Sequence, residues 1–275
     1  MRHRVPLLTL LPAICFAAIG AAQSPSFKDP NLATAAHKYT PPGKEKSPLT
    51  ADELAGLIMV SADGVPIHDL GGLEACKKLT FLYLPDASVM DLTPISKLTN
   101  LEAVTVRGGK IQDLTPLAGL ANLQYLDLSG NQISDLRPLA GLKNLHDLNL
   151  SGNKISDLSP LRDLPALEQL HLAGNQVSDL GPLAGMKSLW LLDIKGNRVA
   201  DLSPLANLNG WRYLYLDQNK ISDLAPLVAT TTAPAGATVA EVPFRTLSIS
   251  GNPLSTAARS RDLPELQKRV LNLVN

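Results

Sequence analysis

Apolar side chains recur in one fixed pattern that repeats every 22 residues along most of the chain. Each unit reads L-x-x-L-x-L-x-x-N-x-I-x-D-L-x-P-L-x-x-L-x-N, and the units start at Leu57, Leu79, Leu101, Leu123, Leu145, Leu167, Leu189 and Trp211. A truncated ninth unit starts at Phe244, which is 11 residues later than the period requires. A strict period of this length is typical of a solenoid, in which each unit packs only on its neighbours. The pattern therefore favours a binding surface over a catalytic pocket.

The first half of each unit alternates apolar and polar positions. Positions 1, 4 and 6 are apolar, as in Leu123, Leu126 and Leu128. This alternation predicts a short strand with one face inward. In the second half, apolar residues spaced by three predict a 3₁₀-like or irregular turn on the opposite side. Strands separated by such return segments pair in parallel, with a right-handed crossover. We therefore predict an α/β repeat solenoid, a right-handed coil with one concave parallel sheet of about nine strands.

An aspartate occupies position 13 in all eight full units: Asp69, Asp91, Asp113, Asp135, Asp157, Asp179, Asp201 and Asp223. It stands before Leu-x-Pro, where its carboxylate can cap the amide two residues further on. The proline that follows lacks an N–H and is tolerated in this first turn. A calcium-binding ladder is the alternative, but no second oxygen-rich column accompanies the aspartates. We interpret the column as structural capping.

An asparagine occupies position 9 in six units: Asn131, Asn153, Asn175, Asn197, Asn219 and Asn252. A side-chain amide both donates and accepts, so a buried column can satisfy the turn backbone of neighbouring coils. The first three units carry Val65, Ala87 and Gly109 instead, which predicts less regular turns there. We expect Gly108 and Gly109 to mark a local distortion.

These repeats resemble the bacterial 22-residue leucine-rich repeats of the internalin-like family. The segment LQYLDLSGNQISDLRPLAGLKN, residues 123–144, matches that family's pattern at every framework position, and the likeness covers about residues 57–254. The resemblance implies a curved coil whose concave parallel sheet binds other macromolecules. No wall-sorting signal, hydrophobic anchor or immunoglobulin-like module is expected after Asn252. A role in adhesion to host cells is therefore not implied.

Residues 1–22 are interpreted as a signal peptide, because two arginines precede an apolar run that ends in Gly20-Ala21-Ala22. Its removal predicts export, to the periplasm or beyond the cell, without stable insertion in a membrane. An uncleaved anchor, or lipidation at Cys15, is the alternative. Cys76 then remains as the one cysteine of the mature chain, at a position that elsewhere holds leucine or methionine. We expect a small buried side chain there, with a reactive thiol as the alternative.

The remaining segments are assigned from composition and capping signals. Residues 23–49 are rich in proline and lack periodicity, which predicts a flexible tether. The sequence Thr50-x-x-Glu53 predicts a capping box for an N-terminal cap over residues 50–56, before the repeat array over 57–254. The insertion, residues 228–243, is expected to form a surface loop, either merely tolerated or used in recognition. Over residues 255–275 we expect a helical cap in which Asp262 caps a helix that runs to about Leu273.

Positions 3 and 5 of the strands point away from the core and supply the candidate binding residues. Four of the chain's five tyrosines fall in these two columns. We assign partner binding to Phe81, Tyr83, Tyr125, Asp127, Asp147, Asn149, His171, Asp193, Tyr213 and Tyr215. Exposed aromatic residues on a rigid sheet are common anchors of protein interfaces. The aspartates between them predict an acidic centre for basic groups, on a floor about 38 Å long. The alternative is a solvated face with unselected polar residues.

The net formal charge of zero gives no electrostatic basis for binding nucleic acid or anionic lipid. We expect a non-catalytic module that binds a protein or peptide, with glycan or cell-wall binding by the same face as the alternative. His171 between Asn149 and Asp193 could form a catalytic or metal-binding cluster. However, a single histidine without a paired nucleophile favours an ordinary surface residue. No cofactor or metal ion is expected.

Overall fold

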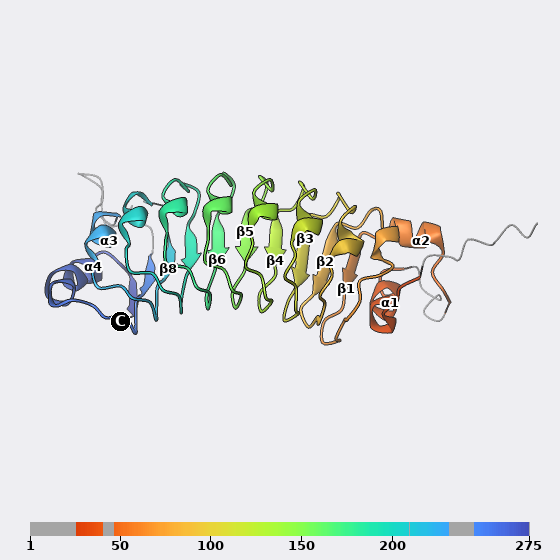
Figure 1. Ribbon diagram of the computed structural model, residues 1–275, viewed down its shortest axis with the longest axis horizontal. Coiled ribbons are helices and arrows are strands. Elements are labelled where there is room, and N and C mark those ends of the chain that lie inside the picture. Colours follow the sequence, from red (N-terminus) through yellow and green to blue (C-terminus); the bar gives the residue numbers. More distant parts are fainter. Residues whose placement is uncertain (1–25, 41–46, 209, 231–244, 275) are drawn as a thin grey trace, which may run out of the picture.

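The computed structural model describes residues 26–40, 47–208, 210–230 and 245–274, and the predicted signal peptide lies outside them. Its strands form one open parallel sheet in sequence order (Figure 1). The strands are β1 Met59–Ser61, β2 Phe81–Leu84, β3 Ala103–Val106, β4 Tyr125–Asp127, β5 Asp147–Asn149, β6 Gln169–His171, β7 Leu191–Asp193, β8 Tyr213–Tyr215, β9 Thr246–Ser248 and β10 Asn272–Val274. The predicted solenoid is confirmed, with ten strands among the described residues where about nine were expected.

The strands pair without any shift in register, so equal repeat positions lie side by side. Leu126 of β4 pairs with Leu148 of β5, which in turn pairs with Leu170 of β6. The constant unit length enforces this register, because a one-residue slip would turn every apolar side chain outward. Positions 3 and 5 therefore form two straight columns along the sheet.

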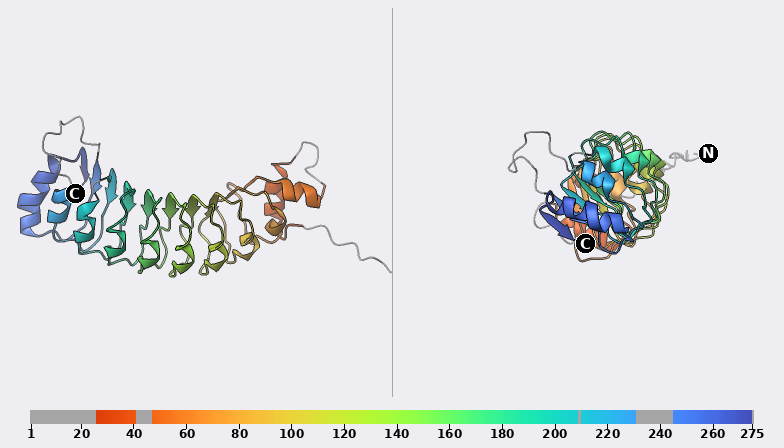
Figure 2. Two further views of the ribbon diagram at one scale, coloured as in Figure 1. Left: turned by 90° about the horizontal axis from the view of Figure 1, so that it is seen from above. Right: turned by 90° about the vertical axis from the view of Figure 1, so that its left-hand side faces the viewer.

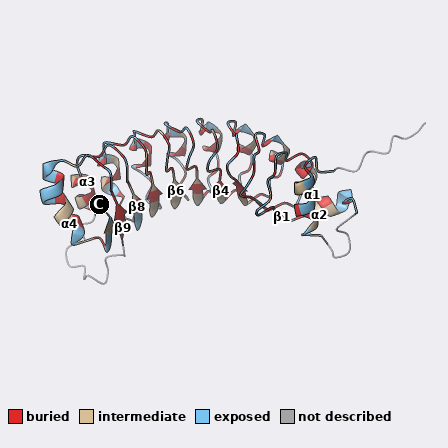
Figure 3. Ribbon diagram, turned by 90° about the horizontal axis from the view of Figure 1, so that it is seen from below, coloured by how far each residue is buried: buried red, intermediate tan, exposed pale blue. Residues whose placement is uncertain are grey.

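Short helical turns occupy the side of each coil opposite the strand. Most are 3₁₀ turns: η1 Leu73–Ala75, η2 Thr93–Ile95, η3 Thr115–Leu117, η4 Arg137–Leu139, η5 Ser159–Leu161, η6 Gly181–Leu183 and η7 Ser203–Asn207. All eight position-13 aspartates accept a hydrogen bond from the backbone N–H two residues on, as in Asp91 to Thr93 at 2.8 Å. The predicted capping role is thus confirmed. Figures 2 and 3 show the coil curving so that the strands line its concave side.

Ladders of leucine fill the space between the sheet and the turns. The position-4 side chains of neighbouring strands, such as Leu126 and Leu148, pair with each other and are buried. Cys76 is also fully buried within this core, and burial raises the pKa of its thiol to about 12. A thiol with this pKa remains protonated at neutral pH, so Cys76 behaves as the small buried side chain that its repeat position predicts.

The position-9 asparagines form a buried column that joins successive coils. The Asn175 amide donates to the carbonyls of Leu150 and Leu172, both at 2.9 Å. Its oxygen accepts the N–H of Ile155 from the preceding coil, also at 2.9 Å. The same three contacts recur at Asn131, Asn153 and Asn197. The predicted column is confirmed.

The third coil departs from this arrangement at Gly109 and not at Gly108. The φ of 67° at Gly108, in the left-handed region that favours glycine, is shared by the regular coils, as in Gly130 at 70° and Gly152 at 69°, so the distortion expected at Gly108 is absent. A Cβ at Gly109 would overlap the carbonyl oxygen of Val89 and the side-chain oxygen of Asn131. An asparagine at this position is therefore sterically excluded unless the turn changes shape.

The prediction of a flexible tether over residues 23–49 is wrong for its middle part, where α1 Pro30–His37 packs against the first coil. Leu32 of this helix is fully buried. The Asp29 carboxylate caps α1 and also accepts the backbone N–H of His68 from the first coil at 2.7 Å. Pro30 occupies the first helical position, where the missing N–H costs nothing. A proline that begins a helix was thus mistaken for a sign of flexible chain.

Both ends of the stack are covered by helices. At the start, α2 Ala51–Gly56 carries the predicted capping box between Thr50 and Glu53. At the end, α3 Ala225–Thr230 replaces a 3₁₀ turn, so the insertion expected from residue 228 begins within a helix. Residues 231–244 of that insertion lie outside the described part of the chain.

The C-terminal cap differs from the single helix that was expected. A π-helical segment Ala258–Asp262 continues into α4 Leu263–Gln267, and the chain then forms β10. Asp262 makes no capping bond but accepts the Arg261 guanidinium at 2.7 Å. Leu273 lies in β10 and pairs with Leu247. The segment expected to form one helix thus forms a short helix and an additional strand.

Candidate binding face

The two columns expected to face outward lie on the concave side of the sheet. Position 3 places Phe81, Tyr125, Asp147 and Tyr213 in one row, and position 5 places Tyr83, Asp127, Asn149, His171, Asp193 and Tyr215 in the next. The residues between them in sequence, at position 4, are buried in the core. The strands therefore bring all ten candidate residues to the same side of the sheet, where Asp127 is buried and the other nine are at least partly exposed.

A group of exposed apolar side chains lies at the N-terminal end of this surface. Phe81 is 39% exposed and Tyr83 is 37% exposed. Leaving such large apolar rings in water is unfavourable compared with burying them. Met59 pairs with Phe81 across the strands and is also exposed. We call Met59, Phe81 and Tyr83 the N-terminal aromatic group.

A second group lies near the other end of the sheet. The rings of Tyr213 and Tyr215 stack with their centroids 6.4 Å apart, and Trp190 packs edge-on against Tyr213 at 6.0 Å. Tyr213 is 40% exposed. We call Trp190, Tyr213 and Tyr215 the C-terminal aromatic group. Trp190 stands at position 2 of its unit, outside the two columns of positions 3 and 5, and is an addition to the predicted set.

A cation already rests on the C-terminal aromatic group. The Lys195 ammonium lies 4.5 Å from the centre of the Tyr215 ring and 3.7 Å from a carboxylate oxygen of Asp217. The other Asp217 oxygen accepts the hydroxyl of Ser248 at 2.5 Å. Lys195 and Asp217 thus neutralise each other beside the rings, and this end of the face carries little net charge.

Asp127 does not present its carboxylate to a partner, which corrects the role assigned to it. It is fully buried and accepts the Arg107 guanidinium at 2.8 Å, the Asn149 amide at 3.2 Å and the backbone N–H of Ser129 at 2.9 Å. Asn149 in turn uses its oxygen to accept the N–H of Ser151. Arg107 lies at position 7 of the preceding coil, so a view restricted to positions 3 and 5 could not reveal this network.

Asp147 and Asp193 remain as the ionisable acids of the two columns that have no salt bridge within the described residues. They flank His171, which pairs with Asp193 across the strands. Burial raises the pKa of Asp147; the His171 ring lowers it and the Asp127 charge raises it further, leaving it above its usual value. In the described part of the chain, no three His, Cys, Asp or Glu side chains are arranged to hold a metal ion. We call Asp147, His171 and Asp193 the central acidic strip.

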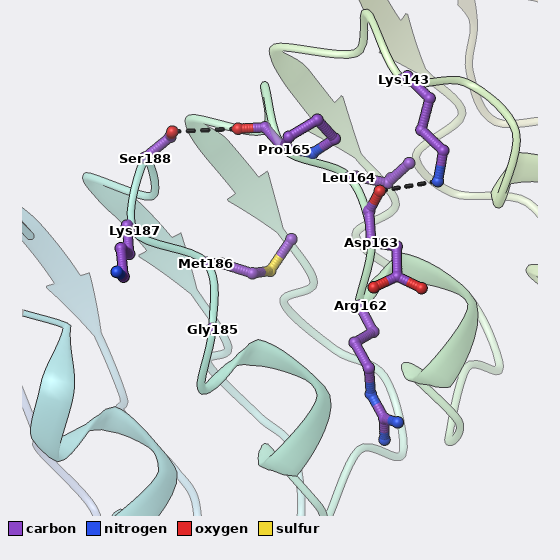
Figure 4. A pocket seen from close by; sticks show the side chains of 9 residues that line it. All are labelled: Lys143, Arg162, Asp163, Leu164, Pro165, Gly185, Met186, Lys187 and Ser188. Carbon is purple, nitrogen blue, oxygen red and sulfur yellow. Dashed lines mark hydrogen bonds between the residues drawn. The ribbon is translucent and has the colours of Figure 1, made fainter.

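A hollow of about 510 Å³ lies outside the concave face, where the turns lead back to the strands (Figure 4). Its rim carries Lys143, Arg162 and Lys187. The Lys143 ammonium already donates to the Asp163 carbonyl at 2.8 Å. Coil 5 has Ala166 where the three preceding coils have an asparagine that bridges to its neighbour, which leaves this side open. None of the candidate residues lines this hollow.

Comparison with known proteins agrees with the geometry. The family described as Leucine Rich repeats (2 copies) matches residues 121–163 and 143–185. The crystal structure of an internalin C2 from Listeria monocytogenes is 33% identical, with a TM-score of 0.72, over 83% of this chain and 98% of that chain. The chain belongs to the internalin-like leucine-rich repeat proteins. A second internalin from the same organism, inlF, is 28% identical, with a TM-score of 0.69. The match covers 92% of this internalin-like chain and 79% of the inlF chain.

A more distant likeness shows the fold alone. The ectodomain of the plant receptor kinase GASSHO1/SCHENGEN3 from Arabidopsis thaliana, in complex with CASPARIAN STRIP INTEGRITY FACTOR 2, is 18% identical. It matches with a TM-score of 0.63 over 74% of the internalin-like chain and 25% of that chain. No curated protein sequence matches.

Leucine-rich repeat proteins generally bind other proteins, and members of this family are generally non-catalytic. None of the helices in the described ranges of this internalin-like chain is long and apolar enough to cross a membrane.

Proposed function

We propose that this protein is an exported, non-catalytic module that binds a protein or peptide through its concave face. The carrying observation is the placement of two aromatic groups on one rigid sheet, with side chains that the fold itself does not require. Other coils carry Ala103, Gln169 or Thr246 at the same repeat positions. Exposed aromatic clusters of this kind are typical of interaction sites, because leaving such rings in water is unfavourable unless a partner covers them.

The test replaces the rings and keeps the fold. A variant with Tyr83, Tyr213 and Tyr215 changed to alanine is expected to lose capture of its partner from the native envelope fraction, as measured by mass spectrometry. Tyr39→Ala is the matched control, because Tyr39 is 41% exposed but lies outside the sheet. Circular dichroism spectra should coincide for all proteins. If the triple variant captures the same protein as Tyr39→Ala does, the concave face is not the binding surface.

Glycan binding is the second candidate, and the C-terminal aromatic group supports it, because tyrosine and tryptophan rings also stack on sugars. Carbohydrate array measurements on the same variants separate the two candidates. A glycan hit that disappears in the triple variant, without a captured protein, would replace the proposal by glycan binding.

Export is part of the proposal and is supported by the composition of residues 1–22. We expect the mature protein to begin at Gln23 when it is recovered from the periplasm or the medium. Determination of the N-terminal sequence of the recovered protein checks this. An intact Met1 in the cytoplasmic fraction would contradict export, and a lipid-modified Cys15 would establish anchoring instead.

A further inference from the structure

The distribution of charge along the concave face indicates the chemistry of its partner. The two columns contain three aspartates and no lysine or arginine at any of their positions from Met59 to Ser248. Arg107 neutralises Asp127 from the preceding coil, and Asp127 is buried. Asp147 and Asp193 therefore supply the unneutralised negative charge in the middle of the face, while aromatic groups occupy both ends.

The carboxylate of Asp147 has no hydrogen-bond donor among the described residues. Its side chain is partly buried, but its oxygens keep contact with water. A cationic donor from outside can replace this water with a charge-assisted hydrogen bond. The neighbouring strand β6 carries His171 and the next strand, β7, carries Asp193, so a second carboxylate lies two strands from Asp147. This arrangement is complementary to an ammonium or guanidinium group from outside.

Strand spacing sets the distance between the three parts of the face. Three inter-strand steps separate β2, which carries Phe81 and Tyr83, from β5 with Asp147, and three more lead to β8 with Tyr213 and Tyr215. At about 4.8 Å per step, each interval is about 14 Å. An extended peptide advances about 3.3 Å per residue, so about four residues span one interval.

We propose that the concave face holds an extended segment of a partner protein, with one lysine or arginine on the central acidic strip. Large apolar side chains about four residues before and after this basic residue contact the two aromatic groups. This inference rests on the proposed function and specifies the chemistry of its partner. The basic residue supplies the missing donor to Asp147, and the flanking residues cover the exposed rings.

The experiment selects peptides from a display library of random 15-residue sequences on the full-length mature protein. Asp147→Asn/Asp193→Asn removes both charges at nearly constant size, and Asp147 makes no hydrogen bond whose loss would disturb the fold. Asp163→Asn is the matched control, because Asp163 is exposed on the lateral side of the coil and lies away from the sheet. A selected peptide and its version with norleucine or glutamine in place of the basic residue are then measured against all three proteins.

We expect the wild type to enrich peptides with one basic residue flanked by large apolar residues. Removing that residue should weaken binding to the wild type and to Asp163→Asn by about tenfold or more. The same removal should have little effect on the double variant, because the carboxylates that it contacts are already absent. This coupling distinguishes a direct ion pair from a general change in charge.

Two other outcomes have separate meanings. The selected peptides could depend on the tyrosines and yet show no enriched basic residue, or bind the double variant as well as the wild type. Either result overturns this inference and leaves the proposed function standing. A selection that yields no peptide dependent on Tyr83, Tyr213 and Tyr215 overturns this inference, and the capture experiment with the triple variant then decides whether the proposed function stands.

Discussion

Replacing one buried asparagine by alanine measures how strongly the coils are joined. In Asn175→Ala, the N–H of Ile155 loses the side-chain oxygen that it contacts at 2.9 Å. The carbonyls that received the Asn175 amide each keep another amide, from Asn153 and Asn197 respectively. One buried backbone donor is thus left without a partner, and this costs about 1–3 kcal/mol of unfolding free energy.

The same change at the start of the column should cost more. Asn131→Ala removes the partner of the Ile111 N–H. It also removes the amide that reaches the Val106 carbonyl, and Gly109 has no side chain to replace it. Two buried backbone groups then lose a contact instead of one, so the expected cost is about 2–6 kcal/mol.

Urea unfolding followed by circular dichroism tests this order. Asn144→Ala is the control, because the Asn144 amide donates to the Ala121 carbonyl in an exposed position, and a change of at most about 0.5 kcal/mol is expected. The reasoning fails if Asn175→Ala is no more destabilised than Asn144→Ala. It also fails if Asn131→Ala unfolds at the same urea concentration as Asn175→Ala, because the count of orphaned groups would then not determine the cost.

Three further predictions concern ionisable groups. Burial raises the pKa of Asp29, but four backbone N–H donors lower it by more, so the pKa lies below its ordinary value. The stability that Asp29 contributes is therefore lost as the pH falls through this depressed pKa. Unfolding of Asp29→Ala should depend less on pH in acid than unfolding of the wild type. Cys76, with a pKa of about 12, should resist iodoacetamide at pH 8 until urea unfolds the chain, and labelling of the native protein would contradict its burial. Burial raises the pKa of Asp147, so the native state disfavours its charged form. Asp147→Asn should therefore melt at a higher temperature than the wild type at neutral pH, and this difference should vanish below about pH 4. The control Asp163→Asn should show no such gain.

The repeating framework could be predicted from the sequence because each position recurs in a constant environment. The spacing of Leu123, Leu126 and Leu128 defines a strand in every coil, and one correct interpretation is therefore repeated along the array. The ends lack this redundancy. The helix at Pro30 and the strand at Leu273 each occur once. The helix is stabilised by packing against the first coil and the strand by pairing with β9 of the last coil, rather than by their own periodicity.

The candidate face was predictable as a surface but not as a set of contacts. Register alone places Tyr83, Asp147 and Tyr215 on the concave side. The pairing of Asp127 with Arg107 depends on a long side chain that crosses between coils, and no repeat position fixes its direction. Trp190 could have been found by treating position 2 as a third column, since it is the one aromatic residue there.

The missing asparagines of the first three coils have a mechanical consequence for recognition. From Asn131 onward, a buried side-chain amide joins each coil to the one before it. The coil that carries Phe81 and Tyr83 lacks this buried amide and is joined by strand pairing and by exposed side-chain hydrogen bonds such as that of Asn100 to Lys77. Thermal fluctuations concentrate where fewer bonds must break together. On the proposed mode of binding, we therefore expect the surface around Tyr213 and Tyr215 to be stiff, and the surface around Phe81 to adjust more readily to the partner.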